Sequence, residues 1–295
     1  MSSGSPGGEH RWVPPDLAGR VAVVTGASRG VGRGIAEVLG GCGATVYVVG
    51  RSIGESATAG RSGVLGDVAT EIERRGGTGV VARCDLTDDE DVDRLFGRVA
   101  DGHGRLDVLV NNAVGWNDTG APEFLWQPPW HEPRWWWDGN FNVGVRSHWL
   151  VTNTAASLLT ARPGGAVFFT SERQPHVAGM QDLVLDLRGT VVARMAQLFA
   201  LHLLPHGVSS IMLYPGFSRT DTIQRGFDEE NDYFGGWTSE DFYAKTASIH
   251  YAGRAVAALA ADPGLLDRTG SLVTSHDAAL AYDFTDVDGT RPDPQ

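Results

Sequence analysis

The feature that most constrains the fold is a glycine-rich turn that directly follows an apolar strand and directly precedes a helix. Residues 21–25 (VAVVT) form a continuous β-branched run, which is typical of a strand buried on both faces. Residues 25–32 (TGASRGVG) follow, and a helical pattern continues to about Leu39. Such a turn lets the backbone approach a pyrophosphate closely, and the helix start presents free N–H groups and a positive dipole. The pattern predicts a dinucleotide-binding turn; a glycine-rich turn without a ligand is the alternative.

The rest of the chain repeats the strand–helix alternation. Further strands are predicted at 44–49, 79–83, 107–113, 166–171, 208–214 and 271–274. Helices are predicted near 68–75, 87–100, 137–159, 186–204 and 251–261. Because this alternation is typical of parallel strands joined by right-handed crossovers, we expect one α/β, doubly wound Rossmann-type domain over residues 17–287. Its seven-stranded parallel sheet should carry helices on both faces.

Four segments stand apart from this pattern. Residues 1–16 are predicted to be a flexible leader, since the first ten lack the basic start and apolar stretch of a signal peptide. Residues 217–250 are polar and aromatic, which suggests a lid over a site. The acidic end of the chain after Asp283, including the tail 288–295, is expected to be mobile or to contact another subunit.

The fourth segment, residues 115–137, is an aromatic insertion that holds six of the nine tryptophans and four prolines. These tryptophans are candidates for the wall of a large apolar pocket, which would suit a bulky, apolar small-molecule substrate. Alternatively, they pack into the core or a subunit interface. Since Trp135, Trp136 and Trp137 are consecutive, they cannot all face one way.

Charge and cysteine content exclude several classes of function. The net charge of −12, from 24 basic and 36 acidic residues, argues against a nucleic acid or an anionic membrane as partner. Cys42 and Cys84 are too few for a disulfide framework or a zinc cluster. No apolar stretch reaches the length of a membrane span. We therefore expect a cytoplasmic protein without a metal.

Two arginines indicate which dinucleotide is bound. Arg51 follows the second strand, where a ribose 2′ position would lie, and Arg29 is inside the glycine turn. An acidic residue there would accept a hydrogen bond from a free 2′-hydroxyl, whereas a guanidinium suits a 2′-phosphate. NADP(H) is therefore the expected cofactor; two solvated surface arginines are the alternative. The expected contacts in the turn are Gly26, Ser28, Arg29, Gly30, Val31 and Gly32.

From about Leu17 to Val287 the chain resembles the short-chain dehydrogenase/reductase family. Besides the glycine turn, three segments match family motifs: Cys84-Asp85-Leu86, Asn111-Asn112-Ala113, and Pro215-Gly216 with Thr220. The resemblance implies that Asp85 holds the adenine amino group and that the next residue, Leu86, also contacts the cofactor. It further implies that Asn112 lies in the central sheet beside the cofactor, and that Pro215, Gly216 and Thr220 lie near the nicotinamide carboxamide. It also implies a homodimer or homotetramer formed through the two long helices that start near Trp137 and Asp186.

The family's catalytic Tyr-x-x-x-Lys pair is missing from this sequence. Counting back from His206, the lysine position falls on Gly189 and the tyrosine position on Leu185. The chain's only lysine is Lys245, and the residue four before it is Asp241. The position of the family's active-site asparagine falls on Gly144, as in one branch of the family. No phenol and ammonium are therefore paired at the usual spacing to move a proton.

Replacement acid–base groups are predicted near the end of the fifth strand. Ser171 or Glu172 falls at the family's serine position, and Glu172 is the better candidate, because a carboxylate above a pocket can have a raised pKa. In the alternative, Glu172 pairs with Arg173 or Arg188 or caps the next helix. Asp186 and Arg188 are expected on the solvated face at the start of that helix.

Three functions remain open at this point. Our first hypothesis is an NADP(H)-binding enzyme that performs non-redox chemistry, such as cyclisation, isomerisation or elimination. The second is an NADPH-dependent oxidoreductase that reduces a carbonyl or enone with a rearranged proton donor. The third is a catalytically inactive NADP-binding scaffold. The fold alone cannot decide among them.

Overall fold

The computed structural model describes residues 12–51, 64–115, 128–171, 182–228 and 236–292. Seven strands form one sheet in the order β3-β2-β1-β4-β5-β6-β7, and every neighbouring pair is parallel. The strands are β1 (Val21–Thr25), β2 (Thr45–Gly50), β3 (Thr78–Arg83), β4 (Val108–Asn111), β5 (Ala166–Thr170), β6 (Ser209–Tyr214) and β7 (Leu272–Thr274). The predicted doubly wound, seven-stranded parallel sheet is confirmed. The chain changes direction across the sheet between β1 and β4, and in such folds ligands bind at the carboxyl ends of those strands.

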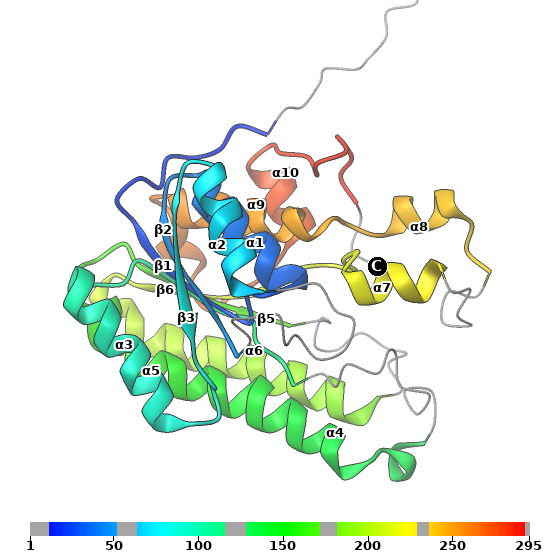
Figure 1. Ribbon diagram of the computed structural model, residues 1–295, viewed down its shortest axis with the longest axis horizontal. Coiled ribbons are helices and arrows are strands. Elements are labelled where there is room, and N and C mark those ends of the chain that lie inside the picture. Colours follow the sequence, from blue (N-terminus) through cyan, green and yellow to red (C-terminus); the bar gives the residue numbers. More distant parts are fainter. Residues whose placement is uncertain (1–11, 52–63, 116–127, 172–181, 229–235, 293–295) are drawn as a thin grey trace, which may run out of the picture.

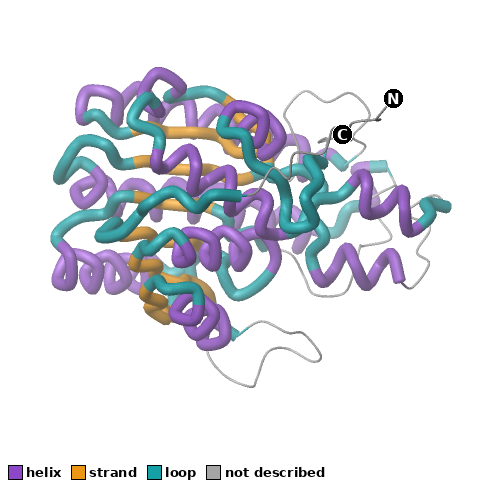
Figure 2. The backbone as a smooth tube through the Cα atoms, turned by 90° about the horizontal axis from the view of Figure 1, so that it is seen from above, coloured by secondary structure: helices purple, strands orange, loops and turns teal. Residues whose placement is uncertain are grey.

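Helices cover both faces of the sheet. Figure 1 shows α1, α2, α9 and α10 above it and α3, α5 and α6 below it, and in Figure 2 the strands lie between these layers. The bounds of the longer helices are α1 (Gly30–Gly41), α2 (Leu65–Arg74), α3 (Asp89–His103), α5 (Ser147–Leu159), α6 (Leu183–Leu203) and α9 (Ile249–Ala261). The shorter ones are α4 (Arg134–Asp138), α7 (Asp221–Asp228), α8 (Ser239–Lys245) and α10 (Ser275–Ala281).

Strand alternation divides the core into two layers. In β1, Ala22 and Val24 pack in the cluster formed with α1 and α9, while Val21 and Val23 pack in the cluster formed with α3, α5 and α6. All four side chains are buried, because successive residues of a strand point to opposite faces and both faces are covered. This explains why the sequence of β1 is a continuous apolar run.

The middle of the chain differs from the single helix expected over 137–159. Helix α4 begins earlier, at Arg134, and a π-helical stretch, η3 (Gly139–Arg146), separates it from α5. At Gly139 the π-helical stretch passes so close to Gly115 that a Cβ on Gly139 would lie 2.6 Å from the carbonyl oxygen of Gly115. The close approach therefore requires glycine. π-Helical turns of this kind are frequent at functional sites.

The described parts of the predicted leader and tail, from residue 12 and up to residue 292, contact each other and the domain. Trp12 packs edge-on against Phe284, with ring centroids 5.5 Å apart. Phe284 and Asp286 are both 1 % exposed, and Asp286 accepts hydrogen bonds from the backbone N–H and hydroxyl of Ser248. The segment around Phe284 and Asp286 thus packs against the domain, because the Phe284 ring contacts Trp12 and the Asp286 carboxylate accepts hydrogen bonds from Ser248 at the start of α9. Residues 1–11 and 293–295 lie outside the described residues.

The segment predicted as a lid, 217–250, leaves and re-enters the domain at one point. The N–H of Ala247 donates to the carbonyl of Phe217 (2.9 Å), and the N–H of Arg219 donates to the carbonyl of Ala247 (2.7 Å). Figure 1 shows α7 and α8 extending from the body beyond this base. The position is compatible with a lid, and its movement stays a prediction.

Candidate nucleotide-binding and active site

The glycine turn is packed so tightly that side chains are excluded from it. A Cβ on Gly26 would lie 2.8 Å from the Cα of Ala113, and a Cβ on Gly32 would lie 2.4 Å from Nδ2 of Asn112. Gly30 has a φ of +55°, which glycine adopts without the usual steric penalty. The predicted turn residues Ser28, Arg29, Gly30 and Val31 are half-buried around this bend. These close approaches fit a turn shaped to bring backbone N–H groups to a phosphate.

Helix α1 starts in a way that suits an anion. Its N-cap residue is Arg29, whose side chain makes no capping hydrogen bond, and its first turn contains no acidic residue. By contrast, Asp88 caps α3 through its carboxylate. The first N–H groups of a helix lack intrahelical partners, and anions bind there readily. The chain's own residues therefore fit a dinucleotide phosphate at α1.

Asn112 holds the glycine turn onto the sheet. Its Nδ2 donates to the carbonyls of Thr25 (3.0 Å) and Gly26 (3.3 Å), and its Oδ1 accepts from the hydroxyl of Thr170 (3.3 Å). The Thr25 hydroxyl in turn accepts from the N–H groups of Asn112 and Ala113. The side chain thus joins the carboxyl ends of β1, β4 and β5. In this structure Asn112 shapes the cradle.

Arg51 and Asp85 follow the neighbouring strands β2 and β3. Arg51 is exposed, as a group reaching for a 2′-phosphate would be. Burial raises the pKa of Asp85, but hydrogen bonds from the N–H and hydroxyl of Thr87 and the charge of Arg51 outweigh it and hold that pKa below its ordinary value. The carboxylate is therefore ionised at neutral pH. Leu86, the next residue, is buried.

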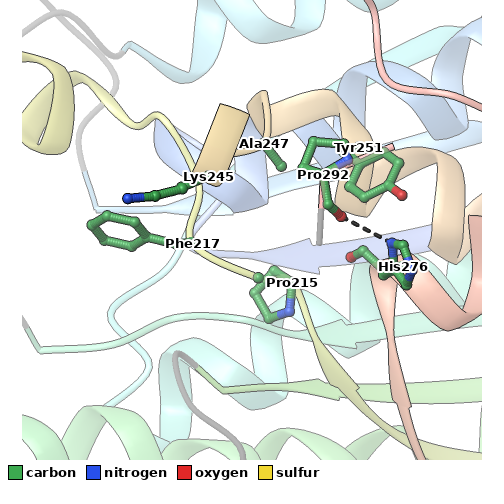
Figure 3. A pocket seen from close by; sticks show the side chains of 9 residues that line it. Pro215, Phe217, Lys245, Ala247, Tyr251, His276 and Pro292 are labelled. Carbon is green, nitrogen blue, oxygen red and sulfur yellow. Dashed lines mark hydrogen bonds between the residues drawn. The ribbon is translucent and has the colours of Figure 1, made fainter. Parts of the chain in front are cut away.

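The segment after β6 returns to the glycine turn. The Cγ2 of Thr220 lies 3.3 Å from where a Cβ of Gly30 would be, so the two predicted motifs are neighbours in space. Pro215 and Gly216 line a small pocket with Tyr251 and His276, shown in Figure 3. The structure thus brings the predicted cofactor residues from β1, β4 and β6 to one edge of the sheet.

The N-terminal end of α6 presents no acid or base at the two positions that the family resemblance predicts for tyrosine and lysine. Leu185 and Gly189 both lie on its buried face. Lys245 is on α8, where its Nζ lies 3.5 Å from Oδ1 of Asp241 and 4.6 Å from the ring centroid of Trp237. In Figure 3 it lies beside Phe217 at one end of the pocket. The single lysine thus pairs within the projecting segment.

The two predicted replacement groups have different outcomes. Ser171 follows β5 and is 5 % exposed, and its N–H donates to the carbonyl of Leu213 (3.2 Å). Its place at the carboxyl edge of the sheet fits a site residue. Glu172, Arg173 and His176 lie outside the described residues, so the role of Glu172 stays a prediction. The cap of α6 is Asp182.

Trp136 joins the aromatic insertion to the start of α6. It is fully buried, and its indole N–H donates to the Asp182 carboxylate at 3.2 Å and 3.3 Å to the two oxygens. The same carboxylate caps α6 by accepting from the N–H of Leu185 (2.8 Å). Trp136 also packs against Leu185 and Val184. Trp135 and Trp137, in contrast, are exposed, so consecutive tryptophans do face different ways.

The expectation that Arg188 lies on a solvated face is wrong. The side chain is 4 % exposed, on the face of α6 that packs against the sheet and η3. Gly144 of η3 makes room for it: a Cβ on Gly144 would lie 2.8 Å from Cδ of Arg188. Asp186, two residues earlier, is only half-buried. Sequence patterning missed this buried cation because arginines in helices are usually solvated.

A second buried polar group near Gly144 was also missed. His148 is 3 % exposed, and one ring nitrogen, Nε2, lies 3.0 Å from the carbonyl oxygen of Ala113. Burial lowers the pKa of His148 to about 4; the contact with Ala113 opposes this, and the positive charge of Arg188 adds to it. His148 is therefore neutral at pH 7. A histidine inside a helix gives no sequence signal that separates this case from a solvated one.

The fold and the site define an α/β protein that binds a dinucleotide at the carboxyl edge of a parallel sheet. The short chain dehydrogenase family model matches residues 20–231. The chain is 34 % identical to mouse dehydrogenase/reductase SDR family member 1 over 291 residues, covering 94 % of this chain and 85 % of the relative. The chain therefore belongs to the short-chain dehydrogenase/reductase family of oxidoreductases.

Solved structures share the fold. A putative dehydrogenase from Xanthomonas campestris has a TM-score of 0.76 at 21 % identity, with 95 % of this chain and 96 % of that chain covered. The angucycline C-6 ketoreductase LanV with bound NADP has a TM-score of 0.70 at 25 % identity, covering 90 % of this chain and 97 % of that chain. Within the described part of the chain no helix is long and apolar enough to cross a membrane.

Proposed function

We propose that this protein is an NADP(H)-binding enzyme that performs non-redox chemistry, such as cyclisation, isomerisation or elimination, on a bulky apolar carbonyl compound. One observation carries the proposal. The buried face of α6 has Leu185 and Gly189 where a proton relay would be required, and the only lysine of the chain is paired with Asp241 on α8. Reduction of a carbonyl to an alcohol needs a proton as well as a hydride. An enzyme that only rearranges its substrate needs no net supply of either.

The cofactor half of the proposal is supported by the cradle. The tight turn, the uncapped start of α1 and the exposed Arg51 fit a dinucleotide with a 2′-phosphate. LanV, a relative in fold, holds NADP. When bound, a nicotinamide cofactor can supply or accept a hydride. In the proposed enzyme it forms one wall of the substrate site.

The substrate half is supported by the apolar residues at the start of α6. Trp136, Val184, Leu185 and Phe141 form an apolar cluster beside the site. LanV, which shares the fold, is an angucycline C-6 ketoreductase. We therefore expect a flat, bulky substrate whose reactive conformer is selected by packing, so that positioning contributes much of the rate.

The second candidate is an NADPH-dependent carbonyl reductase, which the reductase and dehydrogenase relatives favour. Ser171, a bound water or Glu172 would then deliver the proton. Isotope transfer separates the two candidates. The protein is incubated with NADPH deuterated at the transferable C4 position and with a panel of polycyclic ketones and enones, and the products are analysed by mass spectrometry.

Products with the mass of the substrate, or of the substrate minus water, and without deuterium support non-redox chemistry. A product that has gained one deuterium from NADPH and one proton establishes the reductase and overturns the first proposal. Tight NADP(H) binding without turnover of any compound would favour the inactive scaffold. A matched variant, Leu185→Met, changes the apolar wall without adding an acid or base, and serves as the control for substrate packing.

A further inference from the structure

The base of the segment 217–250 is held together by Arg219. Its side chain is 10 % exposed, and its backbone N–H donates to the carbonyl of Ala247 at 2.7 Å. Its Nη1 donates to the carbonyl of Thr246 at 2.5 Å, and its guanidinium lies 5.1 Å from the ring centroid of Tyr243. Arg219 stands near the start of the segment, and these partners stand near its end. The arginine therefore fixes where the chain leaves the domain and where it returns.

The end of the chain completes this base. The Asp286 carboxylate is buried and accepts hydrogen bonds from the N–H of Ser248 (2.6 Å) and from its hydroxyl (2.5 Å). The same carboxylate lies 3.6 Å from Nη2 of Arg219, which also donates to Asp288 at 3.2 Å. A buried carboxylate is costly to leave unpaired, so the loss of one of these contacts weakens the others. We call Arg219, Ser248, Asp286 and Asp288 the clasp.

Each side of the clasp is followed by a residue that approaches α1, the helix after the glycine turn. Thr220 comes directly after the clasp arginine, and its Cγ2 lies 3.3 Å from where a Cβ of Gly30, the first residue of α1, would be. Ile249 comes directly after the clasp serine, and its carbonyl oxygen lies 2.0 Å from where a Cβ of Gly34 would be. The clasp is therefore linked to α1 at its first residue and again about one turn later.

The chain end also reaches the segment that follows β6. Pro292 is buried and lines the small pocket together with Pro215 and Gly216. In Figure 3 its carbonyl oxygen faces His276, whose Nδ1 lies 3.0 Å away. Pro215 and Gly216 are two of the residues expected beside the nicotinamide. The chain end thus lies beside both the base of the segment 217–250 and the edge of the sheet at which the cofactor is expected.

We propose that Asp286 is a positioning residue for NADP(H), which acts through the clasp without touching the cofactor. By holding the two sides of the clasp together, it keeps Thr220 and Ile249 against α1, and the start of that helix keeps the shape that receives a phosphate. Coupling between two sites is reciprocal, so a clasp that favours the cofactor is itself stabilised when the cofactor binds. The inference rests on the proposed function for the cofactor alone and is independent of the reaction.

Cofactor binding and hydrogen exchange test the proposal together. The dissociation constant for NADP⁺ is measured by isothermal titration calorimetry on the full-length protein, on Asp286→Asn and Asp286→Glu, and on the control Asp107→Asn. Asp107 is a matched control because it is also a buried carboxylate, 2 % exposed, that accepts from a backbone N–H (Val21, 2.7 Å) and pairs with an arginine (Arg162, 2.5 Å). It precedes β4 and thus lies at the amino edge of the sheet, away from the expected cofactor site.

We expect Asp286→Asn to weaken NADP⁺ binding about fivefold or more, and Asp286→Glu to recover part of that loss because it keeps the charge. Asp107→Asn should change the dissociation constant by less than about twofold, although it also removes a buried charge, because the two sites are distant. In the wild type, NADP⁺ should slow amide hydrogen exchange in residues 247–249 and 286–290. A purely structural role of Asp286 would produce no such protection.

The exchange measurement needs no variant, so it decides the question if Asp286→Asn does not fold. Exchange in residues 286–290 that is equal with and without NADP⁺ overturns the inference. A folded Asp286→Asn variant with wild-type affinity also overturns it, as does an equal loss of affinity in Asp107→Asn. These three outcomes leave the wild-type protein able to bind NADP⁺. A wild type that binds no NADP⁺ contradicts the cofactor half of the proposed function as well, so the two failures are distinguishable.

Discussion

The contact between Trp136 and Asp182 yields a prediction whose size can be worked out from the structure. Trp136→Phe keeps a buried aromatic ring but removes the indole N–H that donates to the carboxylate. A hydrogen bond to a charged group contributes about 1.5–3 kcal/mol to stability. The donor is shared between two oxygens at 3.2 Å and 3.3 Å, which is long, so we take the low end of that range. The smaller phenyl ring adds about 1 kcal/mol for the unfilled space.

We therefore expect Trp136→Phe to lower the free energy of unfolding by about 2–3 kcal/mol in urea titrations. The matched control is Trp135→Phe, a 38 % exposed neighbour, which should change it by less than about 0.5 kcal/mol. A double-mutant cycle with Asp182→Ala isolates the pair. Coupling below about 0.5 kcal/mol would refute the reasoning, because it would mean that the indole stabilises the fold without the carboxylate.

Three further predictions concern the cofactor, the assembly and the response to acid. Arg51→Glu should weaken NADPH binding by about 10- to 150-fold in fluorescence titrations, because a charge-assisted contact with the 2′-phosphate is lost. NADH binding should stay unchanged or improve, and equal losses for the two cofactors would contradict the assignment of Arg51 to the 2′-phosphate. We propose a homodimer or homotetramer through the exposed apolar side chains of α6, so Leu187→Asp with Leu198→Asp should lower the mass found by light scattering, and a monomeric wild type would contradict this. Burial raises the pKa of Glu37, but hydrogen bonds from His250 and Arg33 outweigh the effect of burial, so the net pKa lies below the ordinary value of 4.5. The ionised Glu37 carboxylate therefore stabilises the fold above pH 4.5, and this stabilisation is lost as the pH falls through the lowered pKa. Glu37→Gln should cost about 2 kcal/mol at pH 7 and make thermal stability less sensitive to pH below 4.5; an acid response equal to that of the wild type would refute this assignment.

The parts of the fold that could be predicted are those set by local pattern. The run 21–25 must be a strand buried on both faces, and the glycines after it must form a turn, because neither sequence has a favourable alternative. The parallel direction of the strands follows from the alternation of strands and helices. The predicted ends of the helices differ from the observed ends by a few residues. The exact ends depend on capping residues such as Asp88, whose hydrogen bonds are visible only in the structure.

The parts that could not be predicted depend on contacts between distant segments. The π-helical stretch begins where Gly139 approaches Gly115, and no periodicity in the sequence signals this contact. Arg188 reads as a solvated helix residue, and its burial depends on Gly144, which is 44 positions earlier in the sequence. The end of the chain reads as a polar tail, although Phe284 and Asp286 are fully buried. In each case the conformation or burial of one residue depends on a partner far away in the sequence. One residue by itself gives no periodic pattern from which that partner could be predicted.

The residues around Gly144 and Leu185 predict how activity should depend on pH. Among the described residues around Gly144 and Leu185, His148 is the one whose pKa is strongly displaced, and its value of about 4 keeps the ring neutral from pH 5 upwards. Turnover that depends on His148 alone should then be independent of pH between about 5 and 8, because its ring does not change charge in that range. If Glu172 is the acid or base, as the sequence suggests, the profile should instead show one ionisation within that range. Glu172→Gln should remove that ionisation and lower kcat while leaving NADP⁺ affinity intact. A flat profile with full activity in Glu172→Gln would assign the reaction to positioning of the substrate, with water as the carrier of protons.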